Sequence, residues 1–131
     1  MSGLPKDQWV WMPHAAHFIC ADRCAFHRAT YVGNWIVSTV GEMSPSILAS
    51  PADKRRGFEK INATSFYETM VFRAEPSENE CCPYQVADWG EVDGDRYMNA
   101  ADAEKGHLAL CEKWSIIDPQ TLEVEKLEQL D

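Results

Sequence analysis

The stretch Thr30-Tyr31-Val32-Gly33-Asn34-Trp35-Ile36-Val37-Ser38-Thr39-Val40 decides the fold of this chain. Two runs rich in β-branched and aromatic residues flank a two-residue Gly-Asn turn. Glycine and asparagine suit the primed turns that join paired strands, so the stretch predicts a β-hairpin over residues 30–40.

Further strands are expected downstream. Residues 66–74 are rich in aromatic and β-branched types and predict an inner strand. Residues 84–89 predict another strand, whereas the glycines and aspartates of residues 90–98 are typical of a loop. Residues 43–56 carry two prolines, which limits them to four or five helical residues or an exposed loop, and residues 57–65 are interpreted as a connection.

The last predicted element is a helix from Asn99, a good N-cap residue, to about Trp114. Its apolar stripe comprises Ala100, Ala103, His107, Leu110, Cys111 and Trp114. The fold class predicted is therefore α+β, a small antiparallel sheet with a C-terminal helix packed on one face. The candidate core residues are Trp35, Phe66, Met70, Phe72, Leu110 and Trp114.

Residues 13–28 allow two interpretations. As a helix, they place four apolar residues on one side, although Asp22 falls on that side too. As extended chain, residues 17–21 form a strand, residues 22–24 turn, and a second strand begins near Ala25. Both interpretations stay open on sequence alone.

The 131 residues fit one domain. We assign residues 1–114 to it and residues 115–131 to an acidic tail, whose leucines among glutamates are compatible with a short docked helix. The chain shows no secretory signal or membrane-length apolar stretch. Its five cysteines, two of them adjacent, suit a reducing cytoplasm better than a disulfide framework.

Charge narrows the classes of partner. Twelve basic residues against 21 acidic ones give a net charge of -9, which disfavours nucleic-acid binding and repels anionic membranes. The same excess favours a partner with a basic surface. The carboxylates gather between residues 75 and 96, where the candidate partner-binding residues are Glu75, Glu78, Glu80, Asp88, Glu91, Asp93 and Asp95. A solvated acidic loop explains the same pattern.

Cysteines and histidines form a second candidate site. Residues 14–27 read His-x2-His-x2-Cys-x3-Cys-x2-His, and a further pair stands four residues apart at 107 and 111. Zinc prefers sulfur and nitrogen ligands in a tetrahedral arrangement, so a zinc site is one hypothesis. Its ligands would come from Cys20, Cys24, His27, His107 and Cys111. Ordinary burial of cysteine and histidine in the core is the alternative.

An enzyme with a cysteine nucleophile would pair Cys24 with His27, or Cys111 with His107. No signature of a known cysteine enzyme surrounds either pair, and the chain carries no phosphate loop, dinucleotide fingerprint, nucleophile elbow or metalloprotease motif. We therefore assign no catalytic residue and expect a protein that is not an enzyme.

Several strings resemble small bacteriophage and prophage proteins to which no activity is attached. They are the segments at residues 11–18, 24–27, 37–42, 67–72 and 106–107, so that the resemblance extends to about Trp114. It implies the cytoplasm of an infected bacterium as the setting, and it implies no mechanism. Small phage proteins often act by binding a host protein, including proteins of host defence.

The functional expectation is a non-enzymatic phage-type accessory protein that binds a host macromolecule through its acidic surface, for instance as an inhibitor of a host or defence protein. The alternative is a Cys/His zinc-binding protein, either structural or a metal-dependent enzyme.

Overall fold

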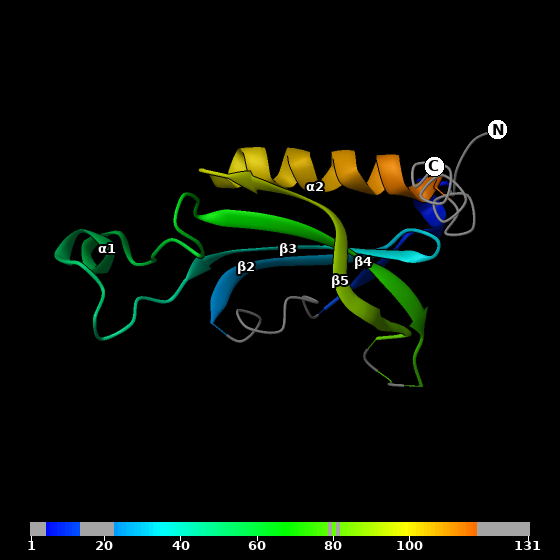
Figure 1. The fold of residues 1–131 in the computed structure, drawn as a ribbon, viewed down its shortest axis with the longest axis horizontal. Helices are drawn as coiled ribbons and strands as arrows, with labels where there is room; N and C mark the ends of the chain where they lie inside the picture. The colour runs from blue at the N-terminus through cyan, green and yellow to red at the C-terminus, as the bar shows by residue number, and fades with distance from the viewer. Residues whose placement is uncertain (1–4, 14–22, 79, 81, 118–131) are drawn as a thin grey trace, which may run out of the picture.

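A computed structural model of the chain describes residues 5–13, 23–78, 80 and 82–117. Its elements are η1 (Lys6–Gln8), β1 (Val10–Met12), β2 (Cys24–Tyr31), β3 (Trp35–Met43), α1 (Pro51–Arg56), β4 (Tyr67–Pro76), β5 (Tyr84–Tyr97) and α2 (Ala100–Ser115). The strands form an antiparallel sheet in chain order, and α2 lies along one face of it (Figure 1). The α+β prediction is confirmed.

The predicted hairpin is formed by β2 and β3. Their ladder runs from the pair Tyr31 and Ile36 to the pair Cys24 and Met43. Gly33 has a φ angle of 75°, which glycine adopts without steric cost, and the Val32 amide donates to the Trp35 carbonyl at 3.0 Å. The strand predicted at residues 66–74 is also confirmed as β4, which pairs with β3 on one side and β5 on the other.

Residues 24–28 are extended, so the helical interpretation is wrong for them. They belong to β2, which pairs with β1 as well as β3, and the strand begins one residue before the predicted start at Ala25. Pairing with β3 supplies these residues with hydrogen-bond partners that a sequence pattern does not reveal. The rest of that segment, residues 14–22, lies outside the described residues.

Residues 90–97 were predicted as a loop, and this prediction is wrong because β5 continues through them to Tyr97. Packing favours glycine at position 94 of this strand, because a Cβ there would lie only 2.9 Å from the Thr69 carbonyl oxygen of β4. Helix α1 has six residues, slightly more than predicted, and is capped by Ser50, whose hydroxyl accepts from the Asp53 amide at 3.1 Å.

The final helix matches its prediction closely. The Asn99 side chain accepts from the Asp102 amide at 2.8 Å, so it caps α2 as expected. Four residues of the predicted stripe are buried against the sheet, namely Ala103, His107, Cys111 and Trp114. The predicted tail at 115–131 lies almost entirely outside the described residues.

The main core lies between α2 and the sheet. It comprises Trp9, Val32, Trp35, Val37, Val71, Cys111 and Trp114. The rings of Trp35 and Trp114 meet edge-on with centroids 4.7 Å apart, and the Trp35 indole donates to the Ile117 carbonyl at 2.7 Å. Of the predicted core residues Trp35, Phe72 and Trp114 are buried, whereas Phe66, Met70 and Leu110 are only partly buried.

Candidate functional site

A row of polar side chains crosses the core beneath α2. His107 is 1% exposed and projects from α2 onto the sheet. Its Nε2 lies 2.8 Å from the hydroxyl of Thr30 on β2, and its Nδ1 lies 2.7 Å from the hydroxyl of Thr39 on β3. The Thr39 hydroxyl lies 2.6 Å from that of Thr69 on β4. Both ring nitrogens are thus satisfied, as buried polar atoms must be.

Burial also sets the protonation state of the core groups. Removal from water, together with the positive charge of Arg28, lowers the pKa of His107 to about 4. Burial raises the pKa of the Cys111 thiol to about 12. At neutral pH the imidazole is uncharged and the thiol is protonated. A thiolate nucleophile is therefore disfavoured at this pair, and the geometry suits packing better than catalysis.

Of the predicted zinc ligands that the structure describes, Cys24 and His27 lie on β2, and His107 and Cys111 lie on α2. His27 and Thr30 stand three residues apart on β2, so His27 points away from the α2 face on which His107 lies. Cys24 stands six residues from Thr30, which corresponds to about 20 Å along the strand. Among the described residues, no three His, Cys, Asp or Glu side chains gather as metal ligands. Cys20 lies outside those residues, and zinc binding stays a prediction.

A small hollow of about 170 Å³ opens beside the buried histidine. It is lined by Trp11, Arg28, Glu104, His107 and Leu108. The Arg28 guanidinium meets the Glu104 carboxylate at 3.1 Å, and the Trp11 ring lies 5.4 Å from the imidazole. Since both histidine nitrogens bond to threonine hydroxyls, the hollow offers an aromatic wall and an ion pair but no free imidazole nitrogen.

The seven candidate partner-binding residues lie on the β4–β5 hairpin. Glu75 is near the end of β4, Glu78 and Glu80 are in the connection, and the four others lie on β5. The segment that the alternative interpretation treated as a solvated loop is therefore largely a pair of strands. Figure 1 places the turn of this hairpin at the end of the molecule remote from α1.

The register of β5 shifts twice against β4. Val71 pairs with Asp93, but Arg73 already pairs with Asp88, so two steps along β4 correspond to five along β5. Residues 89–92 therefore form a bulge in the ladder. Trp89 on this bulge is 56% exposed, and its ring also meets Phe72 edge-on at 5.7 Å. We call Asp88, Trp89 and Glu91, all exposed, the acidic bulge.

Asp93 differs from the other acidic residues because it is engaged within the fold. Its Oδ2 accepts from Lys113 Nζ at 2.8 Å and from the Trp114 indole at 2.8 Å, both on α2. Although burial raises the pKa of Asp93, these hydrogen bonds outweigh it and lower the pKa overall. Asp93 therefore fastens β5 to α2, a role that sequence analysis missed because the partners lie 20 or more residues away.

The other acidic residues face solvent. Among the described residues, Asp88, Glu91 and Asp95 form no ion pair, nor do Glu78 and Glu80. Glu75 accepts a hydrogen bond from Gln85 at 2.9 Å. A cleft of about 470 Å³ between β4 and β5 is lined in part by Glu91, Asp95 and Arg96. Within the described part of the chain, this surface presents carboxylates without ion pairs beside an exposed indole.

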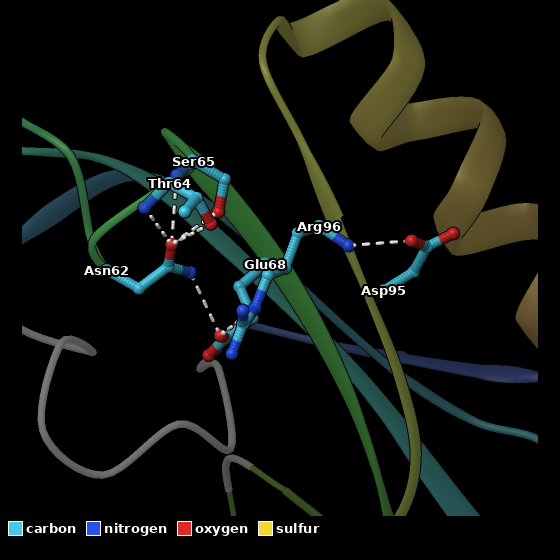
Figure 2. A network of polar contacts seen from close by, with 6 residues as sticks. All are labelled: Asn62, Thr64, Ser65, Glu68, Asp95 and Arg96. Atoms are coloured by element: carbon cyan, nitrogen blue, oxygen red, sulfur yellow. Dashed lines mark hydrogen bonds and ion pairs between the residues drawn. The ribbon is translucent and has the colours of Figure 1, made fainter.

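A polar network at the edge of that cleft fixes the connection after α1 (Figure 2). Asn62 Oδ1 accepts from the amides of Thr64 and Ser65 at 3.0 and 2.9 Å, and its Nδ2 donates to Glu68 at 3.1 Å. Glu68 in turn meets Arg96 of β5 at 3.5 Å. The network joins residues 57–65, predicted only as a connection, to β4 and β5.

A projecting segment at the other end of the molecule carries the opposite charge. We call residues 44–60, which include α1, the basic lobe. It holds Lys54, Arg55, Arg56 and Lys60 against two carboxylates, Asp53 and Glu59. The same lobe also carries two adjacent apolar side chains, whose exposure only the structure shows. Ile47 and Leu48 are 89% and 91% exposed.

No protein-family model, curated protein or solved structure matches this chain. Among the described residues, no helix is both long and apolar enough to cross a membrane.

Proposed function

We propose that this protein is a non-enzymatic, phage-type accessory protein that binds a basic surface of a host macromolecule in the bacterial cytoplasm. The observation that carries the proposal is the acidic bulge, where an indole that is 56% exposed stands between two exposed carboxylates without ion pairs among the described residues. Tryptophan is enriched among residues that dominate binding energy, and surrounding charge steers association.

The remaining chemistry of the chain supports binding over catalysis. The buried histidine is neutral and bonded at both nitrogens, and the buried thiol beside it on α2 has a raised pKa. Inhibition of a host or defence protein is the form of binding that the phage resemblance favours. The acidic hairpin would then occupy a site that the host protein uses for a polyanion or an acidic segment.

Matched charge variants test the proposal. Tagged wild-type protein, E78K/E91K and the control D7K/E112K are used to capture proteins from bacterial lysate, and a captured protein is purified and titrated. The two variants change net charge equally, but only the first alters the hairpin. We expect a basic partner whose affinity falls at least tenfold for E78K/E91K, stays near wild type for the control, and weakens with salt. Equal binding by both variants would refute the hairpin contact.

Zinc binding is kept as the alternative, with a narrowed ligand pool. Both ring nitrogens of His107 are already hydrogen-bonded, so a zinc site would draw on Cys20, Cys24, His27 or Cys111. Elemental analysis of the purified chain, with thermal melts before and after chelation, decides the matter. About one equivalent of zinc and a large fall in the melting temperature would support a structural site.

A further inference from the structure

Hydrogen bonds anchor the part of the basic lobe that carries Ile47 and Leu48, which we call the apolar tip. The Glu59 amide donates to the Met43 carbonyl at 2.9 Å, and the Ser46 amide donates to the Glu59 carboxylate at 3.1 Å. The Arg56 guanidinium lies 4.7 Å from the Phe66 ring centroid. Ile47 and Leu48 are therefore presented to solvent by an anchored loop rather than by a free end.

The tip combines apolar area with positive charge. Lys54 Nζ donates to the Ile47 carbonyl at 3.2 Å, which places the ammonium group beside the tip. Among the described residues, Lys54 and Arg55 have no carboxylate partner within ion-pair distance. Two adjacent aliphatic side chains that are almost fully exposed and flanked by unpaired cations indicate a contact surface.

The acidic bulge has the complementary chemistry. It offers an exposed indole for the aliphatic pair, and the carboxylates of Asp88 and Glu91 for Lys54 and Arg55. The two surfaces lie apart in one copy, because α1 projects from one end of the sheet, whereas the turn from which β5 starts lies at the other end (Figure 1). We propose that the basic lobe of one copy docks on the acidic bulge of a second copy, so that the chain associates head to tail.

The exposed indole of the acidic bulge favours this occupant over a lipid surface. An apolar tip with flanking cations would also suit an anionic bilayer, and a bilayer and a second copy of net charge -9 both repel the chain as a whole. Only the second copy places an aromatic ring between carboxylates at the contact. The contact is heterologous, since each copy uses a different face, and it builds chains or rings rather than closed two-fold dimers.

The inference goes beyond the proposed function, because it needs no host partner and is measured on the purified protein alone. It shares the acidic bulge with that function, so a basic partner and a second copy compete for the same surface. Failure to find a partner would leave self-association standing, and a protein that stays monomeric would leave partner binding standing.

Sedimentation velocity of the purified full chain, from about micromolar to about millimolar concentration, tests the proposal. We expect the weight-average sedimentation coefficient to rise with concentration and to fall when salt is added. The variant I47S/L48S should weaken association at least tenfold. Both side chains are almost fully exposed, so this variant should keep the wild-type thermal melt. A wild-type chain that is monomeric throughout would overturn the proposal.

Charge reversal identifies the two faces. K54E/R55E and D88K/E91K should each be monomeric alone, and an equimolar mixture of the two should associate again because each reversed face then meets its complement. Unchanged association of either variant, or a mixture that stays monomeric, would overturn the pairing. In a parallel flotation assay with phosphatidylserine vesicles, binding that is lost in I47S/L48S would assign the lobe to lipid instead.

Discussion

The imidazole of His107 and the hydroxyl of Thr30, 77 residues apart in the chain, lie 2.8 Å from each other in a fully buried environment. The contact joins α2 to β2, and the second ring nitrogen joins the same helix to Thr39 of β3. A single side chain therefore fixes the position of the helix over two strands. Its hydrogen-bond partners are neutral, which makes the contact sensitive to protonation of the ring.

We predict that the folded protein loses stability as the pH falls from about 6.5 towards 4. The pKa of His107 is lowered from 6.5 to about 4 in the folded state, so the unfolded chain binds the proton first. The stabilising contribution is complete above pH 6.5 and is lost progressively down to pH 4. Its full size is about 3 kcal/mol. Urea unfolding of wild type and H107Q at a series of pH values measures it. A slope shared by H107Q in this window would contradict the assignment.

Thr39 is the centre of the buried polar row, because its hydroxyl meets both His107 and Thr69. Replacing it by valine keeps the shape but leaves the imidazole nitrogen without a partner. We expect T39V to lower the free energy of unfolding by about 1–3 kcal/mol, and T39S to lower it by less because the hydroxyl remains. Denaturant unfolding of both variants provides the comparison. A T39V protein as stable as wild type would show that the hydrogen bond has no net effect.

Asp93 and Asp95 provide a matched pair on β5. Asp93 accepts two hydrogen bonds from α2, whereas the Asp95 side chain is exposed and accepts from the Arg96 amide beside it. We expect D93A to lower the free energy of unfolding by about 1–3 kcal/mol and D95A to change it by less than about 0.5 kcal/mol. Chemical denaturation measures both values. Equal losses would mean that the hydrogen bonds from Asp93 to α2 do not account for the stability lost in D93A.

Gly106 on α2 allows a test in which helix propensity and side-chain packing predict opposite changes in stability. Alanine is favoured over glycine inside a helix by about 1 kcal/mol. A Cβ at this position, however, would collide with the phenol ring of the buried Tyr97. We expect G106A to lower the melting temperature, because the ring must move to accommodate the methyl group. A raised melting temperature would show that the contact relaxes at little cost.

The acidic bulge also predicts how affinity for the host partner depends on the side chain at position 89. Removing the indole with W89A should weaken capture of the host partner at least tenfold, since an exposed tryptophan inside a charged rim acts as an anchor. W89F, which keeps an aromatic ring, should weaken it less. Calorimetric titration of the purified partner gives the affinities. Identical affinities for W89A and wild type would place the contact elsewhere on the hairpin.

Local patterns in the sequence were sufficient for several elements. The Gly33-Asn34 turn between β-prone runs identified the first hairpin, and Asn99 identified the start of α2. The phenylalanine and valine content of residues 66–74 identified β4. Each signal depends on a few adjacent residues whose φ angles, caps or side-chain shape favour one conformation. The candidate acidic residues were likewise visible as a cluster in the chain.

The tertiary structure alone decided the elements and contacts that depend on distant partners. Residues 90–97 have the glycines and aspartates of a loop, but pairing with β4 satisfies their backbone and makes them strand. In the sequence, His107 fits a core stripe and a metal site equally well. The structure decides between them, because Thr30 and Thr39 occupy both ring nitrogens. The charge of the acidic segment is a property of the sequence. The packing of α2 decides which of these carboxylates face solvent, and it engages Asp93 in hydrogen bonds within the fold. The physical reason is that hydrogen bonding and burial are set by neighbours in space rather than by neighbours in the chain.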